Sequence, residues 1–179
     1  MKAVLDACVL YPTVLREILL GVAKAGLYTP LWSPRILEEW ARATVKLGAG
    51  AEAVARGEIA AVSLAFPRAA IAAPQALERR LWLPDPHDIH VLAAAIEGGA
   101  DLIVTFNAAD FPRGILAEEG LERADPDAFL LGLHARDPDA VEGVCRAVRA
   151  EAERLSGQPQ PMRALLKRAR LPRLGKKLG

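Results

Sequence analysis

The chain has 179 residues, of which 52% are hydrophobic and 25% are charged, as in a globular protein and unlike a disordered or fibrous one. This length predicts one ordinary domain with a core of its own, and every apolar stretch is shorter than the roughly 20 residues of a membrane-spanning helix. The N-terminus resembles no signal peptide, so we expect a cytoplasmic protein in which Cys8 and Cys145 stay reduced.

The formal net charge is only +1, but it is unevenly distributed along the chain. Residues 1–156 contain 16 Lys and Arg against 22 Asp and Glu, whereas residues 157–179 contain seven basic residues and no acidic one. A basic segment joined to an acidic body can contact a phosphate backbone or the acidic surface of a partner. A solvated terminal helix is the alternative, and the charge pattern leaves both open.

The chain begins with a pattern typical of a strand followed by a helix. Residues 1–5 form a short apolar run that ends at Asp6, which predicts a buried parallel strand with Asp6 at its carboxyl end. In residues 13–25 apolar side chains recur at helical spacing, and Gly26 is a typical helix stop.

A second strand and helix are predicted next. Residues 27–32 are a strand candidate, and Ser33 followed by proline has the chemistry that opens a helix. That helix carries the adjacent acidic residues Glu38 and Glu39. Residues 49–65 are rich in alanine and predict a further helix, followed by a proline-bracketed connection of uncertain structure.

The second half of the chain repeats the alternation. Residues 83–88 are too rich in proline for regular structure, and they lead into an apolar helix at 89–97 with Asp88 as its N-cap. Residues 100–106 form a β-branched run of strand length that ends at Asn107, with Asp110 in the following loop. Helices are then expected at residues 127–134 and 139–155, covering an edge of the sheet, before a spacer at 157–161 and the basic segment 162–174.

Short strands that alternate with helices predict an α/β fold, a three-layer sandwich with a short central parallel sheet and a C-terminal helical extension. We expect a core domain at residues 1–130, an additional helix packed on it at 131–156, and the basic segment at 157–179. In such folds ligands collect at the carboxyl ends of the strands, where Asp6 and Asn107 would lie.

Five carboxylates, far apart in sequence, are candidates for one site at that end of the sheet: Asp6, Glu39, Asp85, Asp88 and Asp110. Clustered carboxylates repel one another and normally require a cation. Hard oxygen donors favour Mg²⁺ or Mn²⁺, which can activate water and stabilise charge during phosphodiester hydrolysis. His87 and His90 flank Asp88, but no cysteine or further histidine is spaced to complete a zinc site.

Four segments in order, at residues 4–10, 33–39, 85–95 and 100–111, together resemble the motif set of PIN domains, the metal-dependent ribonucleases best known as VapC-type toxins of prokaryotic toxin–antitoxin pairs. The resemblance covers roughly residues 1–130 and leaves the basic tail unexplained. It implies a PIN-like fold, a Mg²⁺- or Mn²⁺-dependent endoribonuclease, cleavage of RNA to a 5′-phosphate and a 3′-hydroxyl, a cognate antitoxin and, by family analogy, a homodimer.

The same resemblance assigns the metal ligands residue by residue. Asp6 matches the first acidic ligand, Asp88 the third, and Glu39 the second, because Glu39 rather than Glu38 fits the spacing from Ser33. These three residues are the predicted catalytic set.

The fourth acidic position of the family falls on Asn107, which is a departure from the pattern. An amide offers an oxygen without a charge, so metal binding would be weaker unless Asp85 or Asp110 contributes. Thr105, near the same strand end, is a further candidate to orient a water or a phosphate oxygen.

Other functions account for the residues less well. The amide at position 107 motivates the alternative of a PIN fold that binds RNA or protein with little catalysis. A haloacid dehalogenase phosphatase would need an Asp where Cys8 stands, so we discount it. Asp6 alone could serve as a helix cap, and Asn107 and Asp110 as turn residues. For Trp32, Trp40 and Trp82 a core or interface role is favoured over base stacking.

Overall fold

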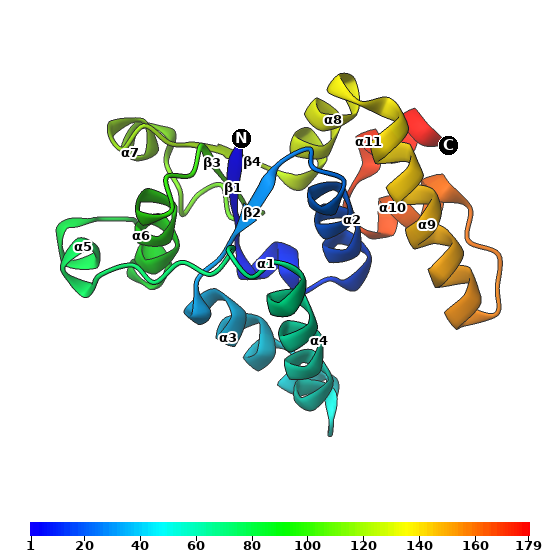
Figure 1. Cartoon of the computed structure of the whole chain (residues 1–179), viewed down its shortest axis with the longest axis horizontal. Helices are drawn as coiled ribbons and strands as arrows, with labels where there is room; N and C mark the ends of the chain where they lie inside the picture. The colour runs from blue at the N-terminus through cyan, green and yellow to red at the C-terminus, as the bar shows by residue number, and fades with distance from the viewer. The chain divides into compact units, whose positions relative to one another are not determined.

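The computed structural model describes residues 1–179 and divides into two compact units. We call Met1–Tyr11 with Thr29–Ala124 the sheet unit, and Pro12–Tyr28 with Asp125–Gly179 the helical unit. Figure 1 labels their elements along the chain. None of the helices is both long enough and apolar enough to cross a membrane.

The sheet unit is built on four parallel strands in the order β2-β1-β3-β4. These strands are β1 (Lys2–Leu5), β2 (Thr29–Leu31), β3 (Leu102–Val104) and β4 (Glu122–Ala124). The apolar run of β1 is central and fully buried, which explains why its sequence shows no alternation. β4 was not predicted, because its sequence Glu-Arg-Ala lacks strand character and it lies at the edge of the sheet.

Helices surround this sheet within the same unit. They are α1 (Ala7–Leu10), α3 (Pro34–Ala43), α4 (Ala51–Ala65), α5 (Gln75–Arg80), α6 (Ile89–Glu97) and α7 (Arg113–Glu118), with 3₁₀ turns η1 (Val45–Leu47) and η2 (Pro86–Asp88). The apolar helix α6 packs on β1 and β3, while α3 contacts both α1 and α4. A parallel sheet flanked by helices, with further helices after it, confirms the predicted α/β fold.

The helix starts near the candidate site show one confirmation and two corrections. Ser33 caps α3, since its Oγ accepts a hydrogen bond of 3.1 Å from the Ile36 amide. The proline-rich segment before α6 is not wholly irregular, because residues 86–88 form the turn η2, which Asp85 caps by accepting from the His87 amide at 2.9 Å. Asp88 occupies the N-cap position of α6, but its side chain makes no capping hydrogen bond. That carboxylate is therefore left for other interactions.

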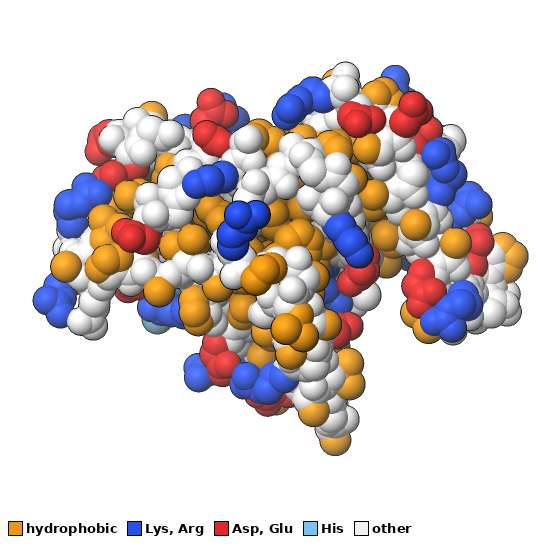
Figure 2. Space-filling view, viewed as in Figure 1, with side chains coloured by type: hydrophobic (Ala, Val, Ile, Leu, Met, Phe, Trp, Pro, Cys, Tyr) orange, Lys and Arg blue, Asp and Glu red, His pale blue; other side chains and the backbone are white.

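Hydrophobic side chains remain on the surface of α4, as Figure 2 shows in the lower part of the view. Val54 and Leu64 on this helix are 65% and 83% exposed. Trp32 and Trp40 are buried in the core, whereas Trp82 is 65% exposed, which leaves an interface as the predicted role still open to it. Trp32 makes an edge-to-face contact with Phe66 at a centroid distance of 5.9 Å.

The helical unit consists of α2 (Thr13–Lys24), α8 (Pro126–Arg136), α9 (Pro138–Ser156), α10 (Met162–Arg168) and α11 (Pro172–Leu178). α9 packs on α2, α8 and α10, and α11 packs on α8 and α10. Gly21 allows the close approach of α2 to α9, because a Cβ there would lie 2.6 Å from Val144 Cγ1. The basic segment, predicted as one stretch, is two helices separated at Arg170, which has a φ of 63°.

Candidate active site

Asp6 and Thr105 meet where two central strands end. Leu5 pairs with Val104 in the parallel register of β1 and β3, so the next residue of each strand emerges at the same edge of the sheet. The Thr105 hydroxyl donates a hydrogen bond of 2.6 Å to Asp6 Oδ2, and both side chains are buried. The sequence predicted Asp6 and Thr105 each near the end of a strand, but not the hydrogen bond that joins them.

Cys8, which the sequence predicted only to be reduced, is a member of this site. Its thiol donates to Asp6 Oδ2 at 3.2 Å, and its sulfur accepts from the Phe106 amide at 3.3 Å. Burial, together with the negative charge of Asp6, raises the pKa of Cys8 to about 12. The thiol therefore stays protonated and acts as a donor to Asp6. Its place two residues after Asp6 in the first motif was the available signal.

The pKa of Asp88 shows that the site is crowded with negative charge. Its pKa rises from the ordinary value of 3.8 to about 6, first because burial penalises the charged form and then because other carboxylates lie nearby. The negative charges that act on it belong to Asp6, Asp110, Asp85 and Glu39. The charges of the four other candidate carboxylates therefore all act on Asp88, at the start of α6.

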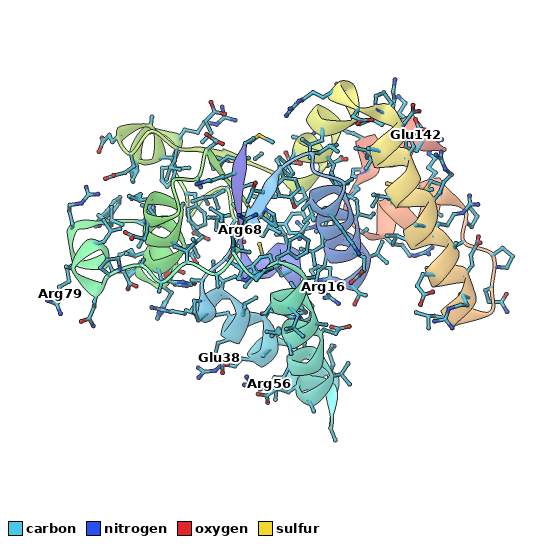
Figure 3. All side chains as sticks on the ribbon, in the orientation of Figure 1. Arg16, Glu38, Arg56, Arg68, Arg79 and Glu142 are labelled. Atoms are coloured by element: carbon cyan, nitrogen blue, oxygen red, sulfur yellow. The ribbon has the colours of Figure 1, made fainter.

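The two adjacent acidic residues of α3 have different surroundings. Figure 3 labels Glu38 on α3 and Arg56 on α4, whose side chains form an ion pair of 2.9 Å. A second ion pair of 2.8 Å joins Glu38 to Arg42, and hydrogen bonds from these arginines lower the pKa of Glu38 to about 2. Glu39, in contrast, is the one whose charge acts on Asp88. The contacts favour Glu39 over Glu38 as a member of the site.

Glu39 also contacts a buried histidine. His90 on α6 is buried, and its Nε2 lies 2.8 Å from Glu39 Oε1, although the two groups are not aligned as a hydrogen bond. Arg35 approaches the same carboxylate oxygen at 3.6 Å. This contact brings Glu39 of α3 next to α6, and the sequence offered no signal for it beyond the proximity of His90 to Asp88.

The loop after β3 contains two candidates for the fourth acidic position, and their surroundings differ. Asn107 is exposed, and its backbone makes the turn: its N–H donates to Thr105 Oγ1 at 2.9 Å and its carbonyl accepts from the Asp110 amide at 3.1 Å. Asp110 is half-buried and its charge acts on Asp88, as does that of Asp85. The hydrogen bonds of Asn107 are those of a turn residue, and Asp110 and Asp85 bring the additional negative charge.

The carboxylates of the site lack basic partners. Within the sheet unit, no ion pair includes Asp6, Asp85, Asp88 or Asp110, and Glu39 alone is approached by Arg35 and His90. No three His, Cys, Asp or Glu side chains converge closely enough to form a metal site from protein ligands alone. A hydrated divalent cation held by one or two carboxylates is compatible with this donor set, because Mg²⁺ usually keeps several of its waters.

A comparison with family models gives a match to the PIN domain over residues 2–109. This chain belongs to the PIN domain family. PIN domains are typically nucleases that use divalent metals, so the fold and family indicate a hydrolase that acts on nucleic acid. The PIN match contains Asp6, Glu39, Asp88, Thr105 and Asn107, and it stops just before Asp110. No curated protein and no solved structure matches the chain significantly.

Proposed function

We propose that the protein is a metal-dependent endoribonuclease and the toxin component of a toxin–antitoxin pair. The observation that carries the proposal is the convergence of Asp6, Glu39, Asp85 and Asp110 on Asp88, with little neutralisation by basic residues. Such an arrangement destabilises the metal-free folded protein, because like charges close together repel one another when they are all ionised. It is therefore typical of a functional site.

In this proposal Asp6, Glu39 and Asp88 hold Mg²⁺ or Mn²⁺, with Asn107 at the fourth family position and Asp110 or Asp85 as acidic substitutes. The bound metal supplies a water of lowered pKa and stabilises the charge that develops on the phosphate and on the leaving oxygen. One or two direct carboxylate ligands are sufficient for Mg²⁺, so the remaining carboxylates of the set would bind through its waters.

The protein's own contribution is to orient the donors. Thr105 and Cys8 both donate to Oδ2 of Asp6, which restrains that carboxylate and leaves Oδ1 free of these two donors. His90 holds Glu39 against α6 through the 2.8 Å contact. Asp88 has no capping bond and no cation, so its carboxylate is available to accept a proton from water or to bind metal.

RNA as substrate, the toxin role, a cognate antitoxin and a homodimer follow from the resemblance to VapC-type PIN domains. The antitoxin would be a small protein whose segment covers the acidic site and blocks access to it. Hydrolysis would leave a 5′-phosphate and a 3′-hydroxyl. The exposed amide of Asn107 favours weaker metal binding than four carboxylates would give.

The test of this function is the cleavage of an end-labelled structured RNA at increasing Mn²⁺ concentrations. A sample in which the metal is chelated serves as the blank. We expect cleavage that saturates with Mn²⁺ and falls by at least about 100-fold in Asp6→Asn, because a ligand that also organises the site is lost. The matched control is Asp139→Asn, an exposed carboxylate in the first turn of α9, which should cleave like the parent. Equal rates for Asp6→Asn and the parent would exclude the assignment, and RNA binding without any cleavage would favour a binding module.

A further inference from the structure

The basic segment that lies beyond the PIN match is an ordered part of the helical unit. Most of its large apolar side chains are buried, namely those of Met162, Leu165, Leu166, Leu171 and Leu174. α10 and α11 pack against each other, and an added Cβ at Gly175 would lie 3.2 Å from the carbonyl oxygen of Arg163. The segment is therefore a helical hairpin with a defined outer surface.

A buried carboxylate from another helix fixes this hairpin. Asp127 of α8 is 4% exposed and accepts hydrogen bonds from the backbone amides of Arg173 at 2.8 Å and Leu174 at 2.9 Å. These amides belong to the first turn of α11, which has no capping side chain of its own. Asp127 thus caps α11 from outside and sets the orientation of the basic residues that follow.

The outer surface of the hairpin is cationic without interruption. All seven basic residues of the segment are exposed, and it contains no acidic residue. Arg173 is paired with Asp125 and Asp127, and Arg168 is hydrogen-bonded to Gln160. Four further basic side chains, on both helices, are Arg163, Lys167, Lys176 and Lys177, and we call these four the hairpin cations.

Charge is also divided between the two units. The sheet unit contains 10 Lys and Arg against 14 Asp and Glu, a net charge of −4, whereas the helical unit contains 13 against 8, a net charge of +5. The unit that carries the acidic site therefore repels a polyanion, and the other unit attracts one.

We propose that the hairpin cations form a binding surface for the phosphate backbone of RNA, independent of its base sequence. The inference rests on the proposed ribonuclease function for the choice of RNA among polyanions. A protein partner is less well matched, because protein interfaces have an apolar centre and the segment exposes no large hydrophobic side chain. The apolar groove of the helical unit, of about 610 Å³, lies elsewhere, between α2 and α9.

Binding of a fluorescent single-stranded RNA, measured by anisotropy in EDTA over a range of salt concentrations, tests the surface apart from catalysis. The test variant is R163Q/K167Q/K176Q/K177Q, and the control is R68Q/R79Q/R136Q/R154Q, which removes the same charge from other exposed positions. Each phosphate contact contributes about 0.7 to the slope of log affinity against log salt. We expect the test variant to lose about 2–3 of this slope and to bind on the order of 10–100-fold more weakly at 0.1 M salt, with a much smaller loss in the control.

Equal affinity and slope for the test variant and the parent would overturn the inference, as would an equal loss in the two variants. Polyglutamate should displace the labelled RNA less effectively than unlabelled RNA at the same charge concentration. Equal displacement by the two polyanions would overturn the assignment to phosphates. The Mn²⁺ cleavage assay separates the two proposals. A parent that binds RNA through the hairpin cations but does not cleave it retains this inference and loses the proposed function.

Discussion

Replacing Asp88 by asparagine should stabilise the metal-free protein while it removes activity. The pKa of Asp88 is raised from 3.8 to about 6, so its charged form is disfavoured in the folded state. That shift corresponds to about 3 kcal/mol at most. Because the side chain is only partly buried, solvent screening reduces the expected gain from Asp88→Asn to about 1–2 kcal/mol at pH 7.5.

The sign of the pH dependence follows from the direction of the shift. A raised folded-state pKa gives a contribution to stability that is present below the unfolded value near 3.8 and is lost as pH rises through about 6. The advantage of Asp88→Asn should therefore be largest above pH 7 and should disappear towards pH 4.

Thermal unfolding in EDTA at several pH values measures this effect. The expected rise in Tm at pH 7.5 is about 2–8 °C, and added Mn²⁺ should raise the Tm of the parent but not that of the variant. Glu97→Gln, at the exposed last residue of the same helix α6, is the control and should change stability by less than about 0.5 kcal/mol. An Asp88→Asn protein that is no more stable than the parent in EDTA would refute the reasoning from charge repulsion.

Three further predictions follow from the contacts. Glu39→Gln should reduce Mn²⁺-dependent cleavage at least about tenfold. Glu38→Gln loses only exposed ion pairs and should cleave within about twofold of the parent. A larger loss for Glu38→Gln than for Glu39→Gln would exclude Glu39 from the site. The cleavage rate at limiting Mn²⁺ should fall as pH drops below about 6, because Asp88 becomes protonated. A higher Mn²⁺ concentration should shift this fall to lower pH, because metal and proton compete for the carboxylate. A fall in rate whose pH does not depend on Mn²⁺ would contradict the assignment of Asp88. Asp127→Ala should destabilise the helical unit by about 1–3 kcal/mol and speed amide hydrogen exchange in α11, and Asp127→Asn should have a smaller effect. Unchanged hydrogen exchange in α11 would show that this cap is unimportant.

The parts of the structure that the sequence predicted are those with local signals. Short buried runs identified β1 and β3, and the polar residues after them led to the prediction that Asp6 and Asn107 lie at the same edge of the sheet. In the structure Thr105 is the residue that hydrogen-bonds to Asp6. Helix α6 was predicted with its observed bounds, because apolar residues fill it and glycines follow. Parallel pairing of β1 and β3 then places the residues that follow them at the same edge of the sheet, whereas Glu39 and Asp88 come from α3 and η2.

The features that were not predicted depend on contacts between distant residues. β4 is a short, polar edge strand that has only its pairing with β3 to define it. The hydrogen bonds of Cys8 to Asp6 and the contact of His90 with Glu39 require the folded geometry of two elements each. Likewise, residues 12–28 join residues 125–179 in one unit because α2 packs on α9, which no local pattern reveals.

The most direct measurement of the central claim is anomalous diffraction from crystals of the protein grown or soaked with Mn²⁺. We expect a Mn²⁺ peak about 2–2.5 Å from carboxylate oxygens of Asp6 and Asp88, with Glu39 or Asp110 bound directly or through water. The peak should be absent in Asp6→Asn crystals prepared in the same way. Saturating Mn²⁺ that leaves this position empty, or a peak coordinated only by other residues, would contradict the assignment of the metal site.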